Sequence, residues 1–157
     1  MRLAIRFVLP LAFVLAGVAY LTIPLIEALT VKWFVRDLDI RSELIANTLQ
    51  EPLAQFIEKG STSKISTLFE RVVQDERLFA IGFCDLSHVL RYRNRNFPDG
   101  IHCESEPASN EVGGIVLQLP QGPLHRSLHD VHSEDGATLG HLILAHDMSF
   151  IARRSTD

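Results

Sequence analysis

The sequence predicts an α+β protein. An N-terminal transmembrane helix continues into a long helix, and a five-stranded, mainly antiparallel sheet with helices on one face follows. Three observations predict this fold. A run of 20 residues without a charge extends from Phe7 to Ile26, apolar residues then recur at helical spacing, and alternating apolar runs separated by turn residues begin near residue 78. The 157 residues suffice for an anchor, residues 1–29, and one domain, residues 30–157.

The uncharged run predicts a membrane anchor. As a helix, 20 residues span roughly 30 Å, the thickness of a bilayer's hydrocarbon core. A cleaved signal peptide is the alternative, because Arg2 and Arg6 precede the run and Ala19 follows small residues that a peptidase accepts. The apolar residues continue through "YLTIPLI", beyond the roughly 7 to 15 residues of a signal peptide's core. An uncleaved single-pass anchor is therefore the preferred interpretation.

The charge distribution predicts where the two sides of this anchor lie. Arg2 and Arg6 favour a cytoplasmic N-terminus, which places residues 30–157 in the periplasm of a bacterium, at the inner membrane. All 19 Asp and Glu residues follow Ile26, whereas two of the 15 Lys and Arg residues precede it. Because the domain is acidic, we expect the lipid bilayer and not a nucleic acid as its partner.

Two helices are predicted before the sheet. The segment from Thr30 to Lys59 has apolar residues three, four and seven positions apart, which fits one face of a helix. Pro52 is expected to kink or divide this helix and Gly60 to end it. The "STS" of residues 61–63 supplies candidate N-caps for a shorter helix. Its apolar stripe is Ile65, Leu68, Phe69, Val72 and Val73. We interpret both stripes as surfaces that face the core.

Five strands are predicted after the second helix. "LFAIGFCDL" (residues 78–86) and "HVLRYRNR" (88–95) are joined by a tight connection around Ser87. "GIVLQLP" (114–120), "PLHRSLHDVH" (123–132) and "ATLGHLILAHDM" (137–148) follow a loop rich in Pro, Gly, Ser and acidic residues. "SEDG", residues 133–136, is typical of a hairpin turn between the last two strands.

Cys84 and Cys103 are the only cysteines of the chain. They form no C-x-x-C motif and no four-ligand zinc pattern. In an oxidising periplasm a disulfide is expected, and closing a loop of about 20 residues stabilises a fold by about 3 kcal/mol. Free buried thiols and a redox role stay open as alternatives.

Three arginines, Arg91, Arg93 and Arg95, stand at every second position of the second predicted strand. On a regular strand their guanidinium groups share one face, which could bind a carboxylate or phosphate. A solvated face is the alternative. We select Arg91, Tyr92 and Arg93 as candidate contacts for a small-molecule ligand.

The histidines and the motif search indicate no catalytic or metal site. His125, His129 and His132 are the most suggestive group; on a strand the first two share a face and His132 points away. Exposed or pH-sensitive histidines are preferred over metal ligands. No G-x-S-x-G, H-E-x-x-H, phosphate-loop or dinucleotide motif occurs. We therefore expect no cofactor, no metal and no enzyme active site in these residues.

The predicted order of elements, ending in "LGHLILAHDMSFIARRS", resembles the Cache-type, PAS-like sensor domains of bacterial membrane receptors. A more specific resemblance is to the N-terminal membrane-sensor region of some bacterial trehalose-6-phosphate synthases of the retaining glycosyltransferase type. It is carried by "WFVRDLDIRSELIANTLQEPL", "QDERLFAIGFCD" and "HDMSFIARRS", between Trp33 and Ser155. That architecture implies a second membrane helix and a cytoplasmic transferase, so we expect a fragment of a longer protein or a free-standing sensor.

Three functions are consistent with these observations. The first is a membrane-anchored extracytoplasmic sensory module, in which a ligand changes the packing between the sheet and the long helix. The second is a ligand-free module that tethers or dimerises an attached enzyme through the long helix. The third is a secreted enzyme released by cleavage near Ala19.

Overall fold

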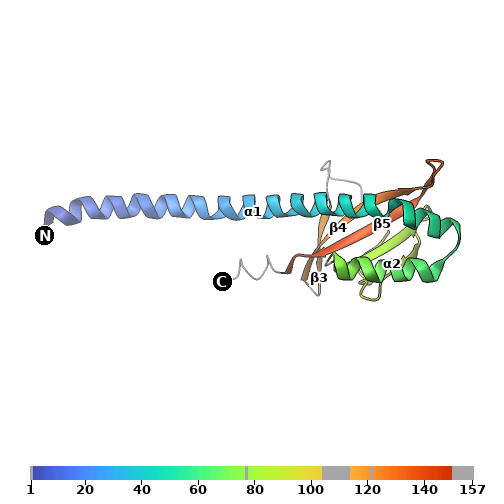
Figure 1. The fold of residues 1–157 in the computed structure, drawn as a ribbon. Helices are drawn as coiled ribbons and strands as arrows, with labels where there is room; N and C mark the ends of the chain where they lie inside the picture. Colours follow the sequence, from blue (N-terminus) through green and yellow to red (C-terminus); the bar gives the residue numbers. More distant parts are fainter. Residues whose placement is uncertain (1, 77, 104–113, 121, 150–157) are drawn as a thin grey trace. The chain divides into compact units, whose positions relative to one another are not determined.

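The computed structural model describes residues 2–76, 78–103, 114–120 and 122–149. The order of elements is α1 (Arg2–Glu58), α2 (Thr62–Asp75), β1 (Ala80–Asp85), β2 (Leu90–Arg93), β3 (Ile115–Leu119), β4 (Gly122–His132) and β5 (Thr138–Asp147), as Figure 1 shows. The chain divides into two compact units, Met1–Val35 and Arg36–Asp157, and helix α1 belongs to both. The predicted α+β fold with a five-stranded sheet is confirmed.

Helix α1 passes Pro52 and ends where Gly60 was expected to end it. Of the two effects expected of Pro52, division of the helix is wrong, since α1 extends to Glu58, whereas a kink stays a prediction; a proline removes one backbone donor but does not by itself stop a helix. Gly60 has a positive φ of 61°, and the amide of Ser61 donates to the carbonyl of Phe56 at 2.9 Å. This left-handed residue and the returning hydrogen bond terminate the helix.

The predicted membrane anchor is not supported by the described part of the chain. Among these residues, no helical stretch combines the length and the hydropathy that a membrane span requires. The anchor at residues 1–29 therefore stays a prediction.

Helix α2 begins after Ser61, as predicted, and buries the expected stripe. Ile65 and Phe69 are fully buried, and Leu68, Val72 and Val73 pack beside them. The hydroxyl of Ser61 makes no capping hydrogen bond, so the start of α2 was predicted correctly but the cap was not. Packing of the apolar face is what holds this 14-residue helix.

The five strands form one antiparallel sheet in the order β2-β1-β5-β4-β3. The predicted turn at residues 133–136 is confirmed: the amide of Gly136 donates to the carbonyl of Ser133 at 3.0 Å, and Gly136 has a φ of 81°. The central strand β5 carries the most buried residues of the sheet, and its neighbours β1 and β4 follow.

Each face of the sheet packs against its own set of apolar side chains. One face carries Ile81, Phe83, Leu142 and Leu144, which pack against residues of both α1 and α2. The opposite face packs against Phe97, Ile101 and the Cys84–Cys103 bridge. The predicted placement of helices on one face is therefore confirmed for the unit Arg36–Asp157.

Candidate functional site

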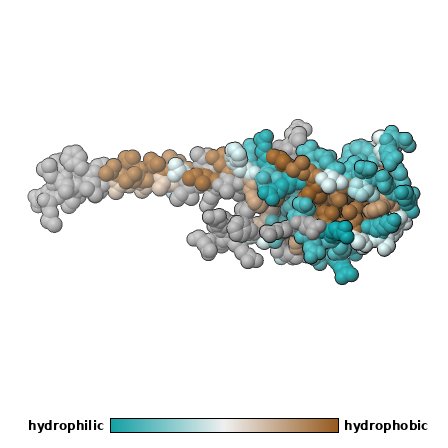
Figure 2. Space-filling view, viewed as in Figure 1, coloured by the Kyte–Doolittle hydropathy of each residue, from teal (hydrophilic) through white to brown (hydrophobic). Residues whose placement is uncertain are grey.

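A groove opens where α1, α2 and the end of β5 meet. We call it the α1–α2 groove; its volume is about 520 Å³, within the roughly 300–1,000 Å³ of small-molecule sites. Its lining residues are Leu38, Arg41, Leu44, Ile45, Thr48, Leu49, Val72, Glu76, His146 and Asp147. Figure 2 shows hydrophobic surface between α1 and α2 with hydrophilic residues around it. An occupant would contact both helices and the sheet.

Five polar side chains line this groove with different partners; the hydroxyl of Thr48 donates to the carbonyl of Leu44 at 2.8 Å within α1. Nε of Arg41 donates to Oδ2 of Asp37 at 2.7 Å, and both side chains are largely exposed. The carboxylate of Asp147 accepts hydrogen bonds from the amide (2.7 Å) and hydroxyl (2.9 Å) of Ser149. Glu76 is exposed at the end of α2. His146 is only 6% exposed, and its Nδ1 is sealed from solvent without a hydrogen-bond partner.

Behind the groove lies a cluster of buried polar groups between α1 and the sheet. We define the histidine cluster as His125, His129 and His146 together with Asp39. His125 and His146 are paired across β4 and β5, with ring centroids 6.3 Å apart. Nε2 of the fully buried His125 lies 3.0 Å from Oδ1 of Asp39, and the amide of Gly114 donates to the same oxygen at 2.7 Å. The carboxylate of Asp39 on α1 thus contacts both His125 of β4 and the backbone of Gly114, just before β3.

Burial lowers the pKa of every histidine in this cluster. The pKa of His146 is lowered to about 4, first by burial and then by the neighbouring His125 and the charge of Arg41. Burial also lowers the pKa of His125, although the carboxylate of Asp39 opposes the shift. The pKa of His129 is lowered by burial as well, against the charges of Glu43 and Asp39. The three histidines of the cluster are therefore mainly neutral near pH 7.

The structure brings together only part of the histidine group selected from the sequence. His125 and His129 face the helices, as strand spacing predicts, whereas His132 is exposed and its Nδ1 lies 3.3 Å from the hydroxyl of Thr138. His146 was missed, although it follows Leu142 and Leu144 at every second position of β5. Within the described ranges, no three His, Cys, Asp or Glu side chains are arranged to hold a metal ion.

The three arginines of the predicted second strand do not all lie on β2. The register shifts by one residue between Phe83 and Cys84, so that Tyr92 pairs with Phe83 and Leu90 with Cys84. Arg91 is the extra residue of this β-bulge, and Arg95 lies beyond the end of β2. Tyr92 packs on the helix-facing side, with its ring 6.1 Å from that of Phe83, whereas Leu90 packs on the opposite face.

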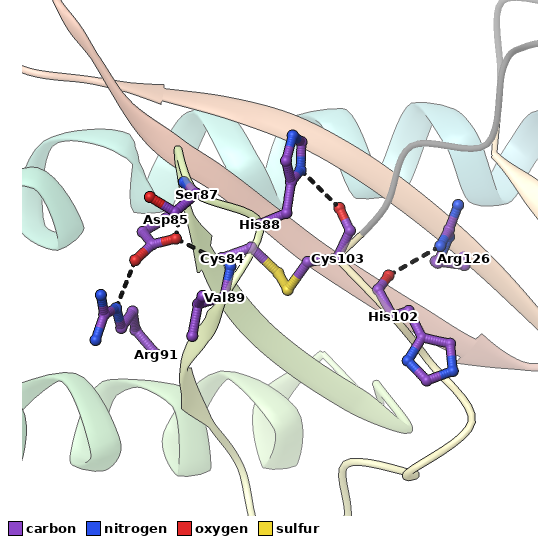
Figure 3. The surroundings of a disulfide bond; sticks show 9 residues. All are labelled: Cys84, Asp85, Ser87, His88, Val89, Arg91, His102, Cys103 and Arg126. Atoms are coloured by element: carbon purple, nitrogen blue, oxygen red, sulfur yellow. Dashed lines mark hydrogen bonds and ion pairs between the residues drawn. A yellow bond between two sulfur atoms is a disulfide. The ribbon is translucent and has the colours of Figure 1, made fainter.

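The guanidinium groups of Arg91 and Arg93 already have carboxylate partners. Arg91 pairs with Asp85, whose carboxylate also accepts from the amides of Ser87 and Val89, each at 2.9 Å (Figure 3). The Val89 amide, followed by Arg91, lowers the pKa of Asp85. Arg93 pairs at 3.3 Å with the exposed Asp99. The contacts of Asp85 close the β1–β2 turn, and the selection of Arg91, Tyr92 and Arg93 as ligand contacts stays a prediction.

Replacing Asp85 with Ala is expected to lower the melting temperature more than replacing Asp99. The carboxylate of Asp85 satisfies two backbone amides of a turn as well as Arg91, whereas Asp99 makes an exposed ion pair of little worth. Thermal unfolding of Asp85→Ala and Asp99→Ala followed by circular dichroism measures this difference. Equal melting temperatures would show that the turn does not depend on Asp85.

The predicted disulfide is present. Cys84 of β1 is bonded to Cys103, 19 residues further along the chain, and the bridge lies on the sheet face away from the helices. Figure 3 shows further contacts at both sides of the bridge: Nδ1 of His88 lies 3.4 Å from the carbonyl of Cys103, and Arg126 donates to the carbonyl of His102 at 3.1 Å. The bridge therefore fixes the segment after β2 to the sheet, remote from the helix-facing histidine cluster.

A comparison with protein-family models finds no match to this chain, and a comparison with curated proteins finds no significant relative.

Proposed function

We propose that this chain is a membrane-anchored extracytoplasmic sensory module, and that the α1–α2 groove is its ligand site. One observation carries the proposal: the groove takes its walls from α1, α2 and β5. A ligand there would contact both the sheet and the helix that leads toward the N-terminus. We assign no catalytic role to these residues.

The mechanism we propose is a population shift between two packings of α1 against the sheet. A ligand shifts this equilibrium only if it binds one packing more tightly than the other. Asp39 and Ser42 belong to the part of α1 where such a difference would act, because Asp39 contacts His125 and Ser42 is fully buried. A change in α1 there would pass along the helix to the predicted anchor.

The proposal also includes the cellular location of the module and its relationship to known sensor domains. The uncharged residues from Phe7 to Ile26 and the arginines before them support an inner-membrane anchor with a cytoplasmic N-terminus. The disulfide supports an oxidising compartment such as the periplasm. The resemblance to Cache-type domains and to the sensor region of trehalose-6-phosphate synthases supports a role in sensing.

A ligand screen on the full chain in detergent tests this proposal. Sugars, sugar phosphates, carboxylates, amines and amino acids are added, and the melting temperature is measured. A ligand at about 100 times its dissociation constant should stabilise the fold by about 2.7 kcal/mol. Thr48→Trp fills the groove from its exposed rim and should abolish the rise, whereas Asn47→Trp, exposed beside it and outside the groove, should not. A folded protein that no compound stabilises would contradict ligand sensing.

A dimerisation module is the second candidate function, because Ile40 and Leu44 of α1 are 52% and 62% exposed. Two such side chains four residues apart form an apolar strip on a helix surface. A homodimer through α1 predicts that Ile40→Asp lowers the molecular mass in solution. If the mass is that of one chain before and after the substitution, this candidate is removed.

A further inference from the structure

The polar groups of the α1–α2 groove differ in how many of their hydrogen-bonding atoms already have a partner in the protein. Both oxygens of Asp147 accept hydrogen bonds from Ser149, so this carboxylate is engaged within its own turn. Arg41 uses Nε toward Asp37, which leaves the two terminal nitrogens of the guanidinium fork for a second partner. Glu76 is exposed at the rim. The groups that can donate to an occupant are therefore Arg41 and His146.

His146 is an unusual wall residue because burial and the nearby charge of Arg41 are both unfavourable to a charged imidazole. The residue is only 6% exposed, and its Nδ1 has no hydrogen-bond partner. Because Nδ1 is closed to water, an occupant of the groove would have to bond to the other ring nitrogen, Nε2.

Apart from Thr48, whose hydroxyl is bonded within α1, the rest of the groove is apolar. Leu38, Ile45 and Leu49 of α1 are each at most 8% exposed yet form its wall, and Val72 of α2 lies opposite. An occupant must therefore present an apolar body to these side chains and a polar group to Arg41 and His146. A fully polar sugar or a metal ion does not match this surface.

We infer that the α1–α2 groove binds a small organic anion with an apolar body, whose carboxylate lies between Arg41 and His146. This inference rests on the proposed function and names the ligand class of the same site. The carboxylate accepts the planar fork of Arg41 and a hydrogen bond from the imidazole. The apolar body covers Leu38, Ile45 and Leu49.

Binding of such an anion is linked to a proton on His146. The charged groups around the imidazole are Arg41 and Asp39 of α1, Glu76 of α2, Asp147 of β5 and the neighbouring His125 of β4. An anion beside the imidazole favours its protonated form and so raises the pKa of His146 from its free value of about 4. Affinity should therefore increase as the pH falls through the pKa of the bound state.

The test uses hexanoate, hexylamine and hexanol as probes of the full chain in detergent, with calorimetric titration at pH 6 and pH 8. Hexanoate is ionised at both values. We expect hexanoate to bind at least tenfold more tightly than the other two, and more tightly at pH 6. Arg41→Gln should weaken it at least tenfold, whereas Arg36→Gln, exposed on the same helix, should not. His146→Gln should remove the pH dependence.

Two results would overturn the inference. The groove would not be an anion site if hexylamine or hexanol bound as tightly as hexanoate. The carboxylate would lie elsewhere if Arg41→Gln and Arg36→Gln bound hexanoate equally. If the wider screen finds a ligand that Thr48→Trp blocks but hexanoate does not bind, the anion assignment fails and ligand sensing stands; if no compound binds, both fail.

Discussion

Replacing His146 with Gln is expected to flatten the dependence of folding stability on pH between about 6.5 and 4. In the folded protein the pKa of this histidine is about 4, against roughly 6.5 in an unfolded chain. Unfolding therefore takes up a proton in this range, and the free energy of unfolding falls as the pH falls. The 2.5-unit difference corresponds to about 3 kcal/mol lost between pH 7 and pH 4.

Urea unfolding of the full chain at pH 7, 6, 5 and 4 measures this effect. His125 and His129 also have lowered pKa values, so His146→Gln should reduce the pH dependence without abolishing it. His102→Gln is the matched control, since His102 is exposed and lies outside the histidine cluster. If the wild-type, His146→Gln and His102→Gln proteins lose stability in parallel on acidification, the buried neutral state of His146 is contradicted.

Removing the disulfide is expected to destabilise the protein by about 3 kcal/mol. The Cys84–Cys103 bridge closes a loop of 19 residues, and its loss releases that loop in the unfolded chain. For a domain of this size the change corresponds to a fall in melting temperature of about 10 °C. Thermal unfolding of the Cys84→Ala/Cys103→Ala protein measures it.

Addition of a reductant to the wild-type protein supplies the control for that experiment. Reduction should reproduce most of the fall in melting temperature, and the double variant should not respond to the reductant. A wild-type protein that melts at the same temperature with and without reductant would show that the bridge contributes nothing to stability.

The elements that could be predicted from sequence are those set by local chemistry. The stripe of Ile65 and Phe69 defines α2, Gly60 ends α1, and the turn at residues 133–136 joins β4 to β5. Each depends on residues within a few positions of one another. The disulfide could be predicted because the chain has no other cysteines.

The site could not be predicted in the same way because it depends on which strands pair. The bulge at Arg91 arises from the register of β2 on β1, and it places Leu90 and Tyr92 on opposite faces of the sheet, although strict alternation predicts one face for both. His146 gains importance from its pairing with His125 and from the Asp39 of a distant helix. The groove requires three elements packed together, so no single segment encodes it.

The central claim is that an occupant of the α1–α2 groove changes the packing of α1 against the sheet. Amide hydrogen exchange of the full chain, with and without saturating hexanoate or the best ligand from the screen, tests it most directly. Exchange should slow in peptides that cover residues 38–49 of α1 and 142–147 of β5, and stay unchanged in peptides that cover β1 and β2. The Thr48→Trp protein should show no such change. Demonstrated binding without altered exchange in residues 38–49 would contradict the account.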